Sequence, residues 1–317
     1  MQIRSNRVVG FTIIELLISL AIAALLLAAM TGLVSGVFET RDDTSVRSAA
    51  TIDARFAMQR MVTAVLGTQR LMLPLADNPN TNWREHVREE TVPATAPEGD
   101  SMLATAVLAV TLNPTLDIDA DGVMDADNDG DGRVDEDTSD DMSNDLESGL
   151  AGIDDDGDGS VDESSPDDDD EDGSADDDPV NAMDDDADGA INEDVPHDMN
   201  FDGLSGIAGI DDDGDGEIDE AHQHDDDEDD LRDEDWLDAV VFFLNGSTLY
   251  ERRPSLNPAD GNDYAEYPIA DNVTHFRVER IPDTGKRAVL VDITLELTLP
   301  DSEPVNLNTR VRVGGGL

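Results

Sequence analysis

The chain has 317 residues, a net charge of −57 and no cysteine. Of its 76 acidic residues, 53 lie between Thr115 and Asp235, where only Arg133 and Arg232 are basic. Such a field repels nucleic acid and attracts divalent cations, which argues against DNA binding. The absence of cysteine excludes disulfides and thiolate metal sites.

The N-terminus begins with a short polar stretch that carries Arg4 and Arg7, and an apolar run then extends from Phe11 to Phe38. Glu15 is the only charged residue in this run, which is long enough to span a bilayer about 30 Å thick. A cleaved secretory signal would place its cleavage site after the apolar core, so we expect this run to be retained. A carboxylate within an apolar helix is costly and marks function or a partner, unless it lies near enough to the membrane surface to stay solvated.

The residues from Gly10 to Leu17, GFTIIELL, resemble the leader junction of type IV pilins and pseudopilins. The resemblance implies a leader of residues 1–10, cleaved after Gly10 by a prepilin peptidase that also methylates Phe11. It implies that Glu15 pairs with the N-terminal amine of a neighbouring subunit, which agrees with the tolerance of a buried carboxylate once a cation neutralises it. A single-pass inner-membrane protein with a periplasmic head is then expected.

The sequence after Phe38 becomes amphipathic, with Ile52, Phe56, Val62 and Leu66 on one face, and Pro74 stops it. We therefore expect a helix over residues 11–72, with 11–38 in the membrane or filament core. Strand patterns follow at 101–112, 236–244, 248–251, 273–281, 288–299 and 305–313. Asn245-Gly246 is a strong hairpin signal. The predicted fold class is α+β, a long N-terminal helix packed on an antiparallel β-sheet formed by 73–114 and 236–317.

The order of these elements is similar to that of minor pseudopilin J of type II secretion systems and of W-type minor pilins, with RAVLVDITLELTLP and VNLNTRVRV as the most similar part. The resemblance implies a tip or assembly subunit of a pseudopilus. Its partners would be other minor and major pseudopilins, with the secreted substrate or the outer-membrane secretin as further candidates. A minor pilin of a surface pilus and a pilin-anchored calcium-dependent adhesin are the alternatives.

Residues 115–235 form an acidic insert that contains an internal duplication. Residues 127–172 align with 184–229 at a constant offset of 57, and about 27 of 46 positions are identical. The pattern Asp-x-Asp-x-Asp-Gly recurs, and the carboxylates at positions 1, 3 and 5 of such a loop turn towards one cation while glycine at position 6 allows a sharp bend. The predicted calcium ligands are Asp117, Asp119, Asp121, Asp127, Asp129, Asp131, Asp135, Asp154, Asp156, Asp158, Asp162, Asp184, Asp186, Asp188, Asn192, Asp211, Asp213, Asp215 and Asp219.

The loops depart from the EF-hand pattern, because the glutamate stands at position 10 rather than 12 and no helices flank the loops. They look more like the calcium repeats of thrombospondin type 3, with the apolar residue at position 8 as an anchor, and several weakly bound Ca²⁺ ions are expected. The alternative is a disordered acidic linker. His222 and His224 could bind a transition metal, but they are interpreted as solvated surface residues. No catalytic motif is present, so we expect no enzyme.

Overall fold

The computed structural model describes residues 13–76, 86–91, 106–180, 183–187, 189–200, 202–212, 215–220, 222–255, 264–281, 289–300 and 303–316, apart from the side chains of 32–45. The chain divides into two compact units, residues 1–49 and 50–317. Gly10 and Phe11 lie outside the described residues.

The first unit contains the beginning of helix α1, which runs from Ile13 to Gly67. Its segment Ile13–Thr31 has a mean hydropathy of 2.6 and is long and apolar enough to cross a membrane. Its leucine and isoleucine side chains are exposed, and Glu15 lies in the first turn. The single apolar span expected near the N-terminus is therefore present as a helix.

In the second unit, the last turns of α1 pack through small and flexible side chains. Ala54, Ala57, Met61 and Val65 are fully buried, whereas Ile52 and Phe56 are exposed. The predicted packing face was therefore wrong at its first half, because alanines allow the helix backbone to approach the sheet more closely than larger residues do.

The helix ends at Gly67 rather than at residue 72. The hydroxyl of Thr68 donates to the carbonyl of Arg70 at 2.7 Å, and strand β1 begins at Leu71 and pairs with a neighbouring strand. Pairing in the sheet thus competes successfully with one more turn of helix.

Among the described residues, nine strands form two antiparallel sheets. The α+β prediction is therefore confirmed, whereas the single predicted sheet is corrected to two. The first sheet has the order β1-β3-β4-β5-β6, and the second has the order β2-β7-β8-β9. The first contains β1 (Leu71–Leu73), β3 (Val107–Thr111), β4 (Ala239–Asn245), β5 (Thr248–Pro254) and β6 (Tyr264–Ala270). The second contains β2 (Val87–Thr91), β7 (Val273–Ile281), β8 (Leu290–Leu297) and β9 (Val305–Arg312). The predicted hairpin joins β4 and β5, with Asn245 opposite Thr248.

Strands β3 and β4 are buried on both faces, which explains their unbroken apolar sequences. Leu108 and Phe242 join the core that contains α1, β7 and β8. Val107 and Phe243, one residue along each strand, join a second cluster that includes Leu150 and Ile153 of the acidic segment. The acidic segment therefore covers the face of the first sheet that the helix does not use.

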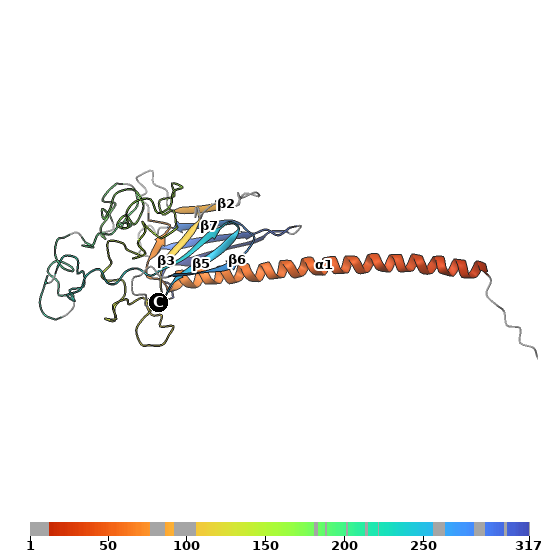
Figure 1. Ribbon diagram of the computed structural model, residues 1–317, viewed down its shortest axis with the longest axis horizontal. Coiled ribbons are helices and arrows are strands. Elements are labelled where there is room, and N and C mark those ends of the chain that lie inside the picture. Colours follow the sequence, from red (N-terminus) through yellow and green to blue (C-terminus); the bar gives the residue numbers. More distant parts are fainter. Residues whose placement is uncertain are drawn as a thin grey trace, which may run out of the picture. The chain divides into compact units, whose positions relative to one another are not determined.

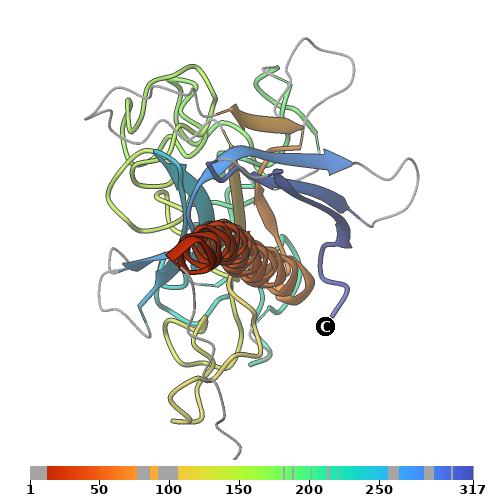
Figure 2. The same cartoon turned by 90° about the vertical axis from the view of Figure 1, so that its right-hand side faces the viewer.

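The acidic segment enters after β3 and returns to β4, and its described residues contain neither helix nor strand. Its loops gather at the end and side of the sheets in Figure 1 and surround the strands in Figure 2. With little regular structure, its backbone must find hydrogen-bond partners elsewhere.

Candidate metal centre

The aspartates of each loop bond to the backbone of the same loop and so bend it around one point. Asp129 accepts the N–H of Asp131 at 2.8 Å, and Asp131 accepts the N–H of Arg133 at 2.6 Å. Asp156 and Asp158 accept equivalent bonds from residues two positions further on. The glycine at the sixth position has a positive φ in every loop of this pattern: Gly122 (98°), Gly132 (103°), Gly159 (102°), Gly189 (121°) and Gly216 (102°). These bends follow the sequence prediction, because side chains other than glycine rarely adopt such angles.

The loop at 127 brings its three predicted ligands together. Oxygens of Asp127, Asp129 and Asp131 lie within 4.8 Å of one another. Acids from further along the chain join this loop in two more groups of the same compactness, Asp129 with Asp229 and Glu234, and Asp131 with Glu136 and Asp227. The loop is therefore surrounded by carboxylate oxygens from both halves of the duplication.

The partial loop at 117 uses a ligand that the sequence pattern did not indicate. Asp117 and Asp119 group with Asp125, which is buried, within 4.8 Å. Asp121 instead accepts the N–H of Val123 at 2.9 Å. Asp125 lies outside the six-residue motif, so that motif alone could not identify it.

The remaining predicted loops show the same design where the structure describes them. Asp154 is buried and accepts the N–H of Gly159 at 3.2 Å. Burial, and then the negative charges of Asp158 and Asp154, raise the pKa of Asp156 to about 6. At loop positions 1, 3 and 5 of the second half, the structure describes the predicted ligands Asp184, Asp186, Asp211 and Asp215, whereas Asp188 and Asp213 lie outside the described residues.

The four predicted ligands at loop position 9 all have left-handed backbone, with φ of 60° at Asp135, 55° at Asp162, 56° at Asn192 and 55° at Asp219. Asp162 accepts the N–H of Gly152 at 2.6 Å, and Asp219 accepts that of Gly209 at 2.6 Å. These carboxylates therefore tie each loop to the turn that precedes it.

Four further loops, beginning at Asp141, Asp168, Asp198 and Asp225, have the same fold. In each, the first aspartate accepts the N–H five residues on, at 2.8 Å from Leu146, 3.0 Å from Gly173, 2.8 Å from Gly203 and 3.1 Å from Asp230. Three of these loops replace an aspartate or the glycine of the pattern, whereas the loop at 168 keeps Asp168, Asp170, Asp172 and Gly173 and was overlooked as a full copy. A spacing of 13 or 14 residues between loop starts, as in 127, 141, 154 and 168, was the signal available.

We name residues 127–180 repeat A and residues 184–237 repeat B. Hydrogen bonds within repeat A recur between the equivalent residues of repeat B. Asp155 and Asp162 donate their N–H groups to Glu171 at 2.7 Å each, and at the offset of 57 Asp212 and Asp219 donate to Glu228 at 2.8 Å each. Ser148 donates to the carbonyl of Asp168 at 2.7 Å, and Ser205 to that of Asp225 at 2.6 Å. The two repeats therefore share one local structure.

The repeats also bind each other reciprocally. The N–H of Asp178 in repeat A donates to the carbonyl of Asp194 in repeat B at 2.9 Å, and Asp235 donates to Asp137 at 3.1 Å. Val180 and Met199 pair at 2.9 Å, and Leu237 and Met142 pair at 2.8 Å. Each bond has its partner at the offset of 57, as in an isologous interface. The acidic segment is thus one module in which the two repeats are held together by reciprocal backbone hydrogen bonds.

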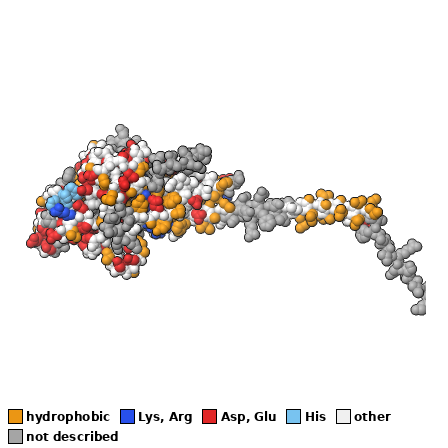
Figure 3. Space-filling model, viewed as in Figure 1, with side chains coloured by type: hydrophobic (Ala, Val, Ile, Leu, Met, Phe, Trp, Pro, Cys, Tyr) orange, Lys and Arg blue, Asp and Glu red, His pale blue; other side chains and the backbone are white. Residues whose placement is uncertain are grey.

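Many carboxylates of this module are buried. The buried acids are Asp125, Asp127, Asp137, Asp154, Asp155, Asp168, Asp170, Glu171, Asp178, Glu193, Asp194, Asp198, Asp225, Asp227, Glu228, Asp235 and Asp238. Within the described chain, the buried cationic side chains are Arg88 and Arg252. Figure 3 shows further acids across the surface of the module. Neutralisation by the protein alone is therefore far from complete.

Several buried carboxylate oxygens have no hydrogen-bond donor in the part of the chain that the structure describes. They include Oδ1 of Asp125, Asp154 and Asp168, Oδ2 of Asp169, and Oε2 of Glu136 and Glu163. Glu136 and Glu163 are the glutamates at loop position 10. An ionised carboxylate buried without a partner is strongly disfavoured, so these oxygens call for a cation.

The pKa values of the module also show that its buried carboxyl groups disfavour ionisation. Burial, and secondarily neighbouring carboxylates, raise the pKa of Glu171, Asp194 and Asp226 to about 8 each. Burial likewise raises the pKa of Asp238, next to β4, to about 8. Ca²⁺ takes six to eight oxygen ligands from carboxylates, carbonyls and water. The donor set is composed of oxygens at suitable spacing, so these residues fit calcium.

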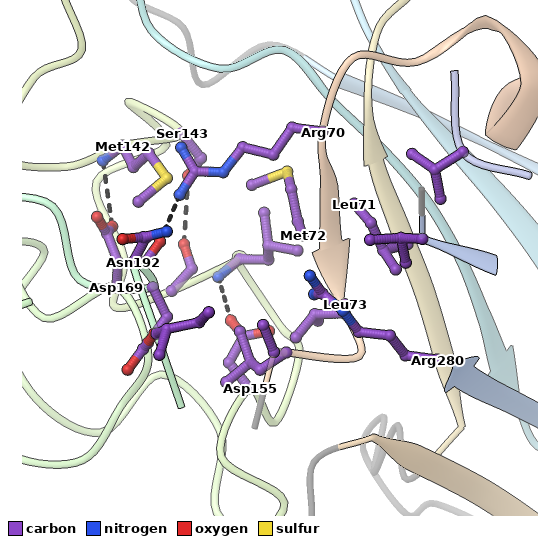
Figure 4. A pocket seen from close by; sticks show the side chains of 18 of the residues that line it. Arg70, Leu71, Met72, Leu73, Met142, Ser143, Asp155, Asp169, Asn192 and Arg280 are labelled. Carbon is purple, nitrogen blue, oxygen red and sulfur yellow. Dashed lines mark hydrogen bonds between the residues drawn. The ribbon is translucent and has the colours of Figure 1, made fainter. Parts of the chain in front are cut away.

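The module is fastened to the head by arginines and by a shared cavity. Arg88 of β2 donates to the carbonyls of Asp154 and Asp155, and Arg252 of β5 donates to that of Ala151. A cavity of about 380 Å³ lies between β1 and residues of both repeats. In Figure 4, Arg70 reaches across this cavity to the carbonyl of Asn192, 2.6 Å away. The head and the module therefore form a continuous body.

Comparison with protein-family models, with curated proteins and with solved structures finds no match.

Proposed function

We propose that this protein is a membrane-anchored subunit of the type IV pilin and pseudopilin class whose head carries a calcium-folded acidic module. Anchoring is supported by the apolar helical segment Ile13–Thr31, and the class by the GFTIIELL junction and by a head of antiparallel sheets. In this proposal Glu15 acts in assembly, and the head contacts other subunits of a secretion pseudopilus.

The observation that carries the calcium part is the set of buried carboxylate oxygens without donors, Glu136 and Glu163 among them. Calcium would supply the positive charge that this chain lacks. The first, third and fifth aspartates of each loop would hold the ions, and the backbone turns fixed by Gly132 and Gly159 orient these aspartates before an ion binds.

Limited proteolysis of the full chain in detergent tests the calcium part. We expect millimolar calcium, but not equal magnesium, to suppress cleavage within 115–235, because Mg²⁺ demands a stricter octahedral geometry and keeps its water. Asp154→Asn should weaken this protection, whereas Glu303→Gln, on an exposed turn of the head, should not. Equal cleavage in calcium and in chelator would refute the calcium-dependent fold.

Mass spectrometry of the mature N-terminus tests the class. The proposal requires a chain that begins with N-methylated Phe11, and Gly10→Lys should leave the leader attached. Deletion of the gene should leave exported enzymes in the periplasm. Intact secretion combined with lost surface attachment would favour the adhesin instead.

A further inference from the structure

Three of the five histidines of this chain lie together in the acidic module, whereas His222 and His224 were interpreted only as solvated surface residues. The rings of His197 and His224 stack with their centroids 3.5 Å apart. The ring of His222 meets that of His224 edge-on at 4.5 Å. Figure 3 shows histidine side chains gathered in one patch on the module surface. The cluster therefore brings together residues that lie far apart in the sequence of repeat B.

Two carboxylates from repeat A complete this cluster. Nδ1 of His197 lies 2.5 Å from Oδ1 of Asp140. An oxygen of Asp176 lies within 4.8 Å of the ligand atoms of both residues. The side chains of His197 and Asp140 are 29% and 46% exposed, so an ion can reach them from solvent.

Each of these histidines stands where repeat A has a different residue. His197, His222 and His224 occupy the positions that Asp140, Ser165 and Asp167 hold in repeat A. His197 and Asp140 are equivalents at the offset of 57 and contact each other, so they lie where the two repeats meet symmetrically. Three oxygen-bearing residues of repeat A are thus replaced by imidazoles that lie together in repeat B.

We propose that His197, Asp140 and Asp176 bind one divalent transition-metal ion of the zinc class, with His224 and His222 beside the site. Imidazole nitrogen suits Zn²⁺, Cu²⁺ and Ni²⁺, whereas Ca²⁺ takes oxygen ligands. The lone pair of an imidazole nitrogen lies in the plane of its ring, so the stacked rings of His197 and His224 do not both face one ion. His197, whose Nδ1 faces Asp140, is the histidine that supplies the nitrogen ligand. One histidine and two carboxylates supply three positions of a tetrahedral zinc site, and water can take the fourth. None of the three residues is a predicted calcium ligand.

Titration with Zn²⁺ of the full chain in detergent tests this site. Millimolar calcium is present throughout, so that the oxygen loops are saturated. We expect one tight zinc site per chain, and about 100-fold weaker binding in the double variant His197→Gln/His224→Gln. The matched control is His275→Gln, because His275 lies in β7 and contacts Thr91 of β2. Its zinc affinity should equal that of the unchanged chain.

A second measurement does not depend on a variant that folds. Co²⁺ bound to the unchanged chain should give the intense visible absorption of a tetrahedral site with a nitrogen ligand, and Zn²⁺ should abolish it. Unchanged zinc affinity in the double variant, or displacement of Co²⁺ by calcium alone, would overturn the proposal. Proteolysis separates the two ideas, since zinc binding without calcium protection would support the histidine site and count against the calcium fold.

Discussion

Repeats A and B have the same loops but different neighbours. In repeat A, Leu150 and Ile153 are 4% and 0% exposed, because they pack against β3 and β4 of the head. Their equivalents in repeat B, Ile207 and Ile210, are 58% and 49% exposed. The hydrogen bonds around both pairs are nevertheless the same. Local sequence therefore determines the loop geometry, whereas the position in the chain determines which copy is buried.

The largest expected effect concerns both repeats at once and depends on pH. The raised pKa values of Asp194 and Asp226, about 8 each, mean that the metal-free folded module binds more protons than the unfolded chain does. The stability that these two carboxyls contribute is therefore fully present below about pH 4 and is lost as the pH rises through about 8. Thermal unfolding in chelator should show this decline.

Calcium should reverse this pH dependence, because the ion binds the ionised carboxylates and must displace protons. Calcium affinity should rise between about pH 6 and 8, with proton release measurable by calorimetry in buffers of different ionisation enthalpy. Stability in chelator that rises over this pH range would show that the buried acids are not the metal-dependent element.

The next prediction concerns one pair of equivalent isoleucines, of which one is buried and the other exposed. Ile153→Asp places a charge in the apolar cluster beneath β3 and β4, and we expect the free energy of unfolding to fall by roughly 4 kcal/mol. Ile210→Asp makes the same change on an exposed surface and should alter stability by less than about 0.5 kcal/mol. Urea unfolding in calcium measures both. Equal losses would mean that repeat B is also packed against a surface of the chain.

Much of the head and of the loop design could be predicted from the sequence. The alternation of residues 273–281 and 305–313 matched strands β7 and β9, and Asn245-Gly246 marked the β4–β5 hairpin. The offset of 57 indicated a repeat whose local bonds are the same in both copies. These features depend on contacts within a few residues, which sequence patterns record directly.

Features set by distant contacts were missed. Strands β2 and β6 lie at sheet edges and carry polar residues or Pro268, so they lack an apolar alternation. The expected position-8 anchors were wrong, since Val134 is only half-buried and Ile218 is exposed. Leu150, Ile153 and Leu237 form the apolar contacts instead. No local pattern shows that Ile153 rather than Ile210 meets the head.

Arginines that cap loop carbonyls provide a smaller test of the same asymmetry. The buried guanidinium of Arg88 bonds to the carbonyls of Asp154 and Asp155. In repeat B, the carbonyl of Asp212 is bonded at 2.6 Å by Arg133, whose side chain is 37% exposed. Arg88→Ala should lower the free energy of unfolding by about 3 kcal/mol, since it leaves buried carbonyls unpaired. Arg133→Ala should cost about 1 kcal/mol, because water can replace it.

The Arg88 and Arg133 variants are best compared by chemical denaturation at one calcium concentration. Arg88→Lys is the control for charge, and it should recover only part of the loss, because lysine lacks the forked geometry that reaches two carbonyls. An Arg133→Ala loss as large as that of Arg88→Ala would contradict the view that the loop at 154 is fastened more firmly than its equivalent at 211.

The smallest effects should be equal in the two repeats, because they depend on local geometry alone. A Cβ at Gly149 would lie 2.0 Å from Oδ2 of Asp155, and one at Gly206 would lie 2.2 Å from Oδ2 of Asp212, at φ of 60° and 57°. Each of these oxygens accepts a backbone N–H, at 2.5 Å from Leu150 and 2.6 Å from Ile207. Alanine would therefore break that bond, and we expect each substitution to lower stability by about 2 kcal/mol.

Gly159 and Gly216 provide the matched controls, since no atom lies within 4 Å of a Cβ at either position. Their shared φ of 102° still disfavours alanine, by about 1 kcal/mol. Differential scanning calorimetry in calcium should thus place the four variants in two pairs, with one member of each pair in each repeat. A grouping by repeat instead, with both repeat B variants neutral, would mean that the exposed copy does not hold the loop structure that the buried copy has.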